Sequence, residues 1–183
     1  MDEKSESQAE ILCKSCGLCC TGHLFSWAKL RPSELDPAET LGMIVSRSDP
    51  GQRGFSQPCP LWHGQCTIYE LPQYPHVCRA YKCKLLKQMI AGQAPLTDAL
   101  EVIDQAKGLI QELDNSLPHS PGLNFRERLV AYLENQPRVD ASRSRQADTE
   151  SGWRQKAEDL LAFYEAVFGV DDLIERAEER DSG

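Results

Sequence analysis

The second half of the chain has apolar residues at the spacing of α-helices. Residues 97–115 are predicted to form a helix whose apolar side chains share one face, and these are Leu100, Ile103, Ala106, Ile110 and Leu113. Asn124 and Glu127 have the spacing of a capping box, and Pro137 follows one helix length later. A second helix is therefore predicted between Asn124 and Pro137.

Two patterns follow toward the end of the chain. Residues 137–150 contain one large hydrophobic residue and are predicted to form an exposed linker. A wide apolar stripe over residues 153–168 predicts another helix, and Asp171 is expected to cap a short last one. These C-terminal helices are expected to pack on the rest of the chain.

The first half has shorter and less regular patterns. A short helix is predicted over residues 36–44, with Asp as its cap and Pro in its first turn. Turn-forming residues fill 46–58, which is expected to be a surface loop, and two short apolar stretches around a glycine predict a hairpin over 59–69. Helical spacing over 79–91 places Cys83 inside a helix or just ahead of it.

These elements predict a mainly α fold with a small, irregular cysteine-rich metal-binding region and a short β-hairpin. Residues 1–92 are expected to form the cysteine-cluster region. Residues 93–183 are expected to form a helical region that packs on it, so that the 183 residues make one structural domain.

Charge and hydropathy exclude several classes of protein. The formal net charge is −8, with a sequence pI near 5.0, so a nucleic-acid backbone would be repelled and no nucleic-acid partner is expected. No apolar run approaches the roughly 20 residues that cross a bilayer, so no membrane association is predicted. The first ten residues are acidic and polar, unlike an export signal, which favours a cytoplasmic location.

Cysteine usage is the strongest chemical signal in this sequence. All eight cysteines fall within the first half, and they are Cys13, Cys16, Cys19, Cys20, Cys59, Cys66, Cys78 and Cys83. In a reducing cytoplasm they would not persist as structural disulfides. Buried, inert thiols are the alternative, but four thiols within eight residues at this spacing are typical of metal ligation.

The spacing leaves the kind of metal open. Three thiols at C-x2-C-x2-C spacing, expected to wrap a single loop, favour an iron–sulfur cluster, whereas zinc usually takes paired knuckles. Adjacent Cys19 and Cys20 are expected to diverge and to serve different sites, or to leave one thiol free. Lys14, Arg79, Lys82 and Lys84 are the cations expected near the sulfurs, and His63 and His76 are the histidines worth testing.

Three segments together carry a family resemblance. The chain reads CKSCGLCC, then CPLWHGQCTIY, then YPHVCRAYKC, and in this order it resembles the CxxCxxCC-type zinc- or iron-chelating domains of the YkgJ-like cysteine-cluster proteins. That family includes the cysteine domain of flagellin lysine N-methylase. The resemblance covers about residues 13–84 and implies that all eight cysteines hold metal. One departure is that Tyr74-Pro75 stands where the family has Arg-Pro.

Three functions follow as expectations. The first is a non-catalytic binding or electron-transfer module that holds an iron–sulfur cluster, [4Fe-4S] in type, or zinc. The second is a metal-dependent protein-modifying enzyme similar to the methylase, using S-adenosylmethionine; no glycine-rich nucleotide motif supports it, so the sequence leaves enzymatic activity open. The third is a redox or metal-handling protein with a low-pKa thiol near Lys14. A protein partner is compatible with all three.

Overall fold

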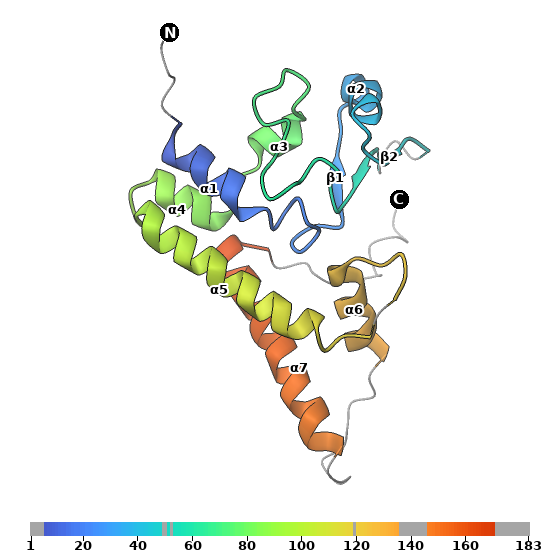
Figure 1. Ribbon diagram of the computed structural model, residues 1–183, viewed down its shortest axis with the longest axis vertical. Helices are drawn as coiled ribbons and strands as arrows, with labels where there is room; N and C mark the ends of the chain where they lie inside the picture. The colour runs from blue at the N-terminus through green and yellow to red at the C-terminus, as the bar shows by residue number, and fades with distance from the viewer. Residues whose placement is uncertain (1–5, 49–50, 52, 119, 136–145, 171–183) are drawn as a thin grey trace.

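The computed structural model describes residues 6–48, 51, 53–118, 120–135 and 146–170. In this part of the chain the fold is mainly α-helical, as expected, and it also contains one three-stranded antiparallel sheet (Figure 1). None of the helices described is long and apolar enough to cross a membrane. The helix expected after Asp171 lies outside the described residues.

Helix α1, Gln8–Cys16, is a correction to the expected loop over the first cysteines. Ser7 and Glu10 form a reciprocal capping box: the Glu10 amide donates to Ser7 Oγ at 3.3 Å, and the Ser7 amide donates to the Glu10 carboxylate at 2.8 Å. Gly17 ends the helix with φ 71°. The sequence did not predict this helix because the start of the chain is polar and gives no apolar stripe; only Leu12 in the helix is fully buried.

The central strand of the sheet, β3, lies within residues 46–58, where a surface loop was expected. Strands β1, β2 and β3 pair in the order β1-β3-β2, and their bounds are Trp27–Lys29, Val45–Ser46 and Gly54–Ser56. Phe55 in β3 is 1% exposed, so one aromatic side chain anchors a segment that otherwise reads as turn residues. The expected hairpin over 59–69 is reduced to a single bridge between Trp62 and Cys66, with Gly64 at φ 78° between them.

The short helices differ from expectation at their ends. Helix α2, Leu35–Thr40, follows the 3-10 turn η1, Pro32–Glu34, so it starts and ends earlier than the predicted 36–44. The predicted helix over 79–91 is two helices, α3 at His76–Ala80 and α4 at Lys84–Ile90. Cys83 is the N-cap of α4, which confirms its expected place just ahead of a helix.

The long helices agree best with the sequence pattern. Helix α5, Leu96–Asp114, begins after Pro95 rather than at a Thr97 cap, and α6, Phe125–Asn135, has the predicted capping box of Asn124 and Glu127. Helix α7, Gln146–Phe163, takes in the end of the expected linker over 137–150. It continues into the π-helical turn η3, Tyr164–Phe168.

Buried side chains form two hydrophobic cores. The helical core joins α1 and the turn after it to α4, α5, α6, α7 and η3, with α7 packed along α5 (Figure 1). The sheet core is smaller and lies under β3 and α2; its buried members are Leu30, Leu35, Ala38, Met43, Phe55 and Ile68. The cysteines lie between the two cores, because Cys16, Cys19 and Cys83 pack on the first, and Cys59, Cys66 and Cys78 pack on the second.

Replacing Gly17 with alanine should strongly destabilise the fold. A Cβ at this position would lie 2.1 Å from Cζ2 of Trp62, and the φ of +71° already disfavours any L side chain. We expect a loss of about 3 kcal/mol in the free energy of unfolding, measured by urea denaturation, from left-handed strain and overpacking together.

The matched control is Gly92→Ala. Gly92 has nearly the same φ, +72°, but an added Cβ would meet nothing within 4 Å. It should lose only about 1 kcal/mol. Equal losses in the two variants would show that the Trp62 contact does not constrain the fold.

Candidate functional site

Five short segments bring the eight cysteines together. Cys13 and Cys16 lie on α1, Cys19 and Cys20 in the turn that follows, Cys59 and Cys66 in the loop after β3, Cys78 in α3, and Cys83 at the start of α4. All eight are free and half-buried. The sequence predicted their shared region, but it placed the first four in one loop.

The end of α1 arranges the first thiols. Cys13 and Cys16 are three residues apart on a helix, so their side chains share a face. After Gly17 the chain turns back, and the Thr21 amide and hydroxyl both donate to the Gly17 carbonyl, at 2.8 and 2.9 Å. This turn presents Cys19 and Cys20 beside the helix that carries the other two.

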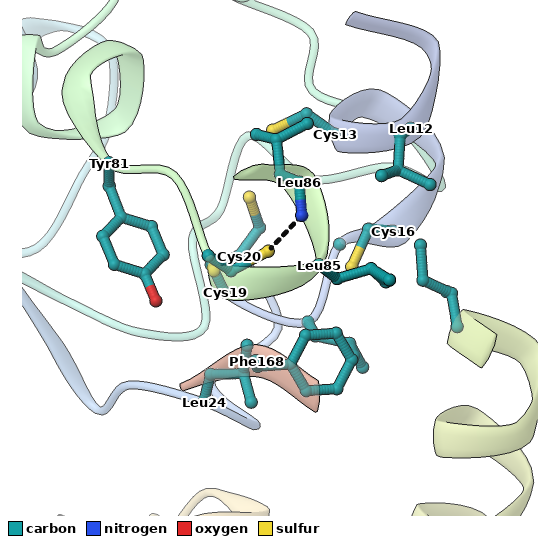
Figure 2. A pocket seen from close by; sticks show the side chains of 14 residues that line it. Leu12, Cys13, Cys16, Cys19, Cys20, Leu24, Tyr81, Leu85, Leu86 and Phe168 are labelled. Carbon is teal, nitrogen blue, oxygen red and sulfur yellow. Dashed lines mark hydrogen bonds between the residues drawn. The ribbon is translucent and has the colours of Figure 1, made fainter. Parts of the chain in front are cut away.

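A small cavity of about 60 Å³ lies among five of the thiols. Figure 2 shows Cys13, Cys16, Cys19 and Cys20 around it, with Leu24 and Phe168 of the helical core at one side. Cys83 also lines it, and the dashed line in Figure 2 is the Leu86 amide donating to Cys83 Sγ at 3.4 Å. The thiols here lie directly against apolar side chains of the helical core.

Backbone amides point at four of the sulfurs. The amide of Leu18 acts on Cys16, and that of Leu61 acts on Cys59, each two residues further along the chain. Ile68 and Tyr69 supply amides to Cys66, and Leu85 and Leu86 supply them to Cys83. Hydrogen bonds of this kind favour the thiolate form, which is the form that binds metal.

Burial nevertheless raises the pKa of every one of the eight thiols. In each case desolvation is the largest influence, and it lifts the pKa of Cys16 to about 11 and that of Cys78 to about 12. The same direction holds for the others, Cys13, Cys19, Cys20, Cys59, Cys66 and Cys83. The metal-free protein therefore keeps its thiols protonated at neutral pH.

An open cleft of about 900 Å³ runs past the thiols toward α6. Four cysteines line it, namely Cys13, Cys19, Cys20 and Cys78. Its other walls carry aromatic side chains from several elements, Phe25, Trp27, Tyr74 and Tyr81, and charged side chains from β1 and α6, Lys29, Arg126, Glu127 and Glu134. Half of the thiols are thus reachable from a space that could hold a ligand.

The cations near the sulfurs differ in part from those expected. Lys14 does act on Cys66, but its Nζ is also paired with Glu6 at 2.7 Å and Glu70 at 2.9 Å. Arg79 lies over the Tyr74 ring at 5.1 Å. Lys107 lowers the pKa of Cys16 and Lys87 that of Cys83, and both oppose the larger effect of burial.

Sequence reasoning missed Lys107 because it lies far along the chain on α5. Its Nζ reaches the Ser15 carbonyl at 3.0 Å, a contact that no local pattern could reveal. Tyr74 and Tyr81 were also missed, although the pKa of each is raised, first by burial and then by nearby thiols. The sequence could have indicated both tyrosines, because each lies within a few residues of Cys78 or Cys83.

The two histidines singled out in the sequence analysis make hydrogen bonds through their backbone amides. The His76 amide donates to Glu34 Oε1 at 2.6 Å, and the His63 amide donates to the Gln65 carbonyl at 3.1 Å. His23 lies elsewhere, between Thr21 Oγ1 at 2.6 Å and the Phe125 ring at 5.1 Å.

Within the described residues, no three His, Cys, Asp or Glu side chains are already arranged to hold a metal ion. The donors gather without converging on one point. No family model, curated protein or solved structure matches the chain. The resemblance to the YkgJ-like proteins therefore stays a prediction, and the argument for function depends on the geometry and chemistry of the thiols.

The raised thiol pKa values predict how the metal-free protein responds to pH. Unfolded thiols ionise near their ordinary pKa of 9.0, whereas the folded ones keep their protons to higher pH. Above about pH 9 the unfolded chain therefore binds fewer protons, and the free energy of unfolding should fall as pH rises further.

Urea unfolding of the reduced, chelator-treated protein at a series of pH values above and below about 9 checks this. The thiol contribution should be complete on the acid side and should decline on the alkaline side. A free energy of unfolding that stayed constant or rose through this range would contradict the burial of protonated thiols.

Proposed function

We propose that this chain is a metal-binding cysteine-cluster protein that acts as a non-catalytic binding or electron-transfer module. The observation that carries the proposal is the gathering of eight free thiols from five segments, with backbone amides aimed at four of them. Inert core cysteines would have no need of such donors, because a protonated thiol behaves as a small apolar group.

The donor set fits zinc or an iron–sulfur cluster. Both take four thiolates, and both gain from amide donors to sulfur. A cysteine can move its sulfur by changing χ1 among three staggered wells, and metal binding commonly couples to such local ordering. The sulfurs that gather here can therefore converge when the thiols are deprotonated.

The lean sheet core supports a stabilising role for the metal. Among the residues that the structure describes, six buried ones make up this core, and three of the cysteines pack against it. A bound metal would add folding free energy where hydrophobic burial is small. The helical core is larger and includes long helices, so it should keep its secondary structure when metal is removed.

The redox-sensing alternative needs a thiol of low pKa, and the structure does not favour it. Burial raises the pKa of Cys66, although it is the thiol on which Lys14 acts. The ammonium of Lys14 is shared with two carboxylates, which weakens its effect on sulfur.

The open cleft favours a second candidate, a metal-dependent protein-modifying enzyme like the methylase. Its volume of about 900 Å³ is enough for a cofactor or a peptide segment, and four thiols border it. Calorimetric titration of the metal-loaded protein with S-adenosylmethionine tests this candidate. Saturable binding that Val130→Trp abolishes would support it, because Val130 lines the cleft. Absence of binding would leave the non-catalytic module.

Metal analysis after anaerobic purification tests the main proposal. A brown protein with iron and acid-labile sulfide would indicate a cluster, and a colourless protein with stoichiometric zinc would indicate a zinc site. A colourless, folded protein without either metal would contradict the proposal.

Cys16→Ser and Cys78→Ser should each lower the metal content by about half or more, because each removes one thiolate from a four-ligand site. Ala99→Ser is the matched control: Ala99 is fully buried in the helical core, so this variant should lose stability but keep its metal. Metal analysis of the three folded variants would contradict the ligand assignment if all retained the wild-type content.

A further inference from the structure

The two hydrophobic cores sort the cysteines into groups. Cys16, Cys19 and Cys83 pack on the helical core. Cys59, Cys66 and Cys78 pack on the sheet core. Each group thus has three thiols, one fewer than a four-thiolate site needs, and Cys13 and Cys20 remain to be assigned.

Cys13 belongs with the helical group. It lies one helical turn before Cys16 on α1, which packs against α4, and Cys83 is the N-cap of α4. It also lines the 60 Å³ cavity together with Cys16, Cys19 and Cys83.

Cys20 belongs with the sheet group, although it also borders the small cavity. Its carbonyl accepts a hydrogen bond from the Cys59 amide at 2.7 Å, which ties its backbone to the loop that carries Cys59 and Cys66. Cys59, Cys66 and Cys78 already pack together on the sheet core, so Cys20 completes this group.

We propose that the eight thiols form two neighbouring four-thiolate metal sites: site A from Cys13, Cys16, Cys19 and Cys83, and site B from Cys20, Cys59, Cys66 and Cys78. This assignment rests on the proposed metal-binding function and divides its ligands. Adjacent Cys19 and Cys20 then serve different sites, because successive side chains diverge from one backbone.

The amide donors are divided in the same way. Site A has two supported sulfurs, Cys16 and Cys83, and site B also has two, Cys59 and Cys66. Each site thus combines two thiolates that receive backbone donors with two that border the cleft. The matching donor sets suit soft, thiolate-preferring cations at both sites.

Cadmium-113 is the probe that separates the two sites, because it occupies thiolate sites and is visible by NMR. The reduced, metal-stripped full chain, titrated with the cadmium ion alone, should bind two equivalents and give two resonances. Cys19→Ser and Cys83→Ser should remove or shift one resonance, and Cys20→Ser and Cys59→Ser the other. Adjacent residues with opposite effects form the matched pair of variants.

A measurement on the wild-type chain keeps the test independent of variant folding. With one equivalent of cadmium, alkylation followed by mass spectrometry should show that the four thiols of a site are protected together. Either one set of four is protected before the other, or both sets are partly protected, with the same extent for all four thiols of a set. Cadmium bound at a single resonance, or protection that mixes the sets, would overturn the division while leaving metal binding intact. A chain that binds no cadmium would overturn the proposed function itself.

Discussion

The close approach of Gly17 to the Trp62 indole is the constraint on which the thiol arrangement depends. Gly17 ends the helix that belongs to the helical core, and Trp62 lies in the loop between Cys59 and Cys66, which belongs to the sheet side. A few residues further on, the Cys59 amide donates to the Cys20 carbonyl. A side chain at position 17 would overlap the Trp62 indole and would have to displace it from this junction between the two cores.

Charge is the second constraint, because four thiolates around a divalent ion at a proposed site would leave a net charge of −2 in a half-buried place. The chain is already acidic, at −8, and Lys14 is shared with two carboxylates. Backbone amides meet this need without adding side chains, since a dipole fixed at a helix start or tight turn requires little reorganisation. Cys83 at the N-cap of α4 shows the arrangement most directly.

The sequence predicted the long helices and the place of the cysteines well, and the short elements poorly. Helices α5 and α6 carry several turns of periodic apolar side chains, so a few residues that depart from the pattern do not obscure the helix. Strand β3 has three residues, and its burial depends on Phe55 meeting segments distant in the chain. Spacing indicated metal ligands among the first four cysteines, and the family resemblance extended that prediction to all eight. The proposed division between two sites depends on which core each segment joins, and Lys107 approaches Cys16 only through tertiary packing.

The side of the thiols that faces the cleft distinguishes a working centre from a purely structural one. Backbone amides act on Cys16, Cys59, Cys66 and Cys83, and the four thiols that border the cleft are the others, Cys13, Cys19, Cys20 and Cys78. A purely structural metal gains nothing from open access, because exposure invites ligand exchange and oxidation. Here a partner or small ligand in the cleft would meet sulfurs directly, beside Tyr74, Tyr81 and Arg126. This asymmetry favours binding or electron transfer at the cleft over a role limited to holding the fold together.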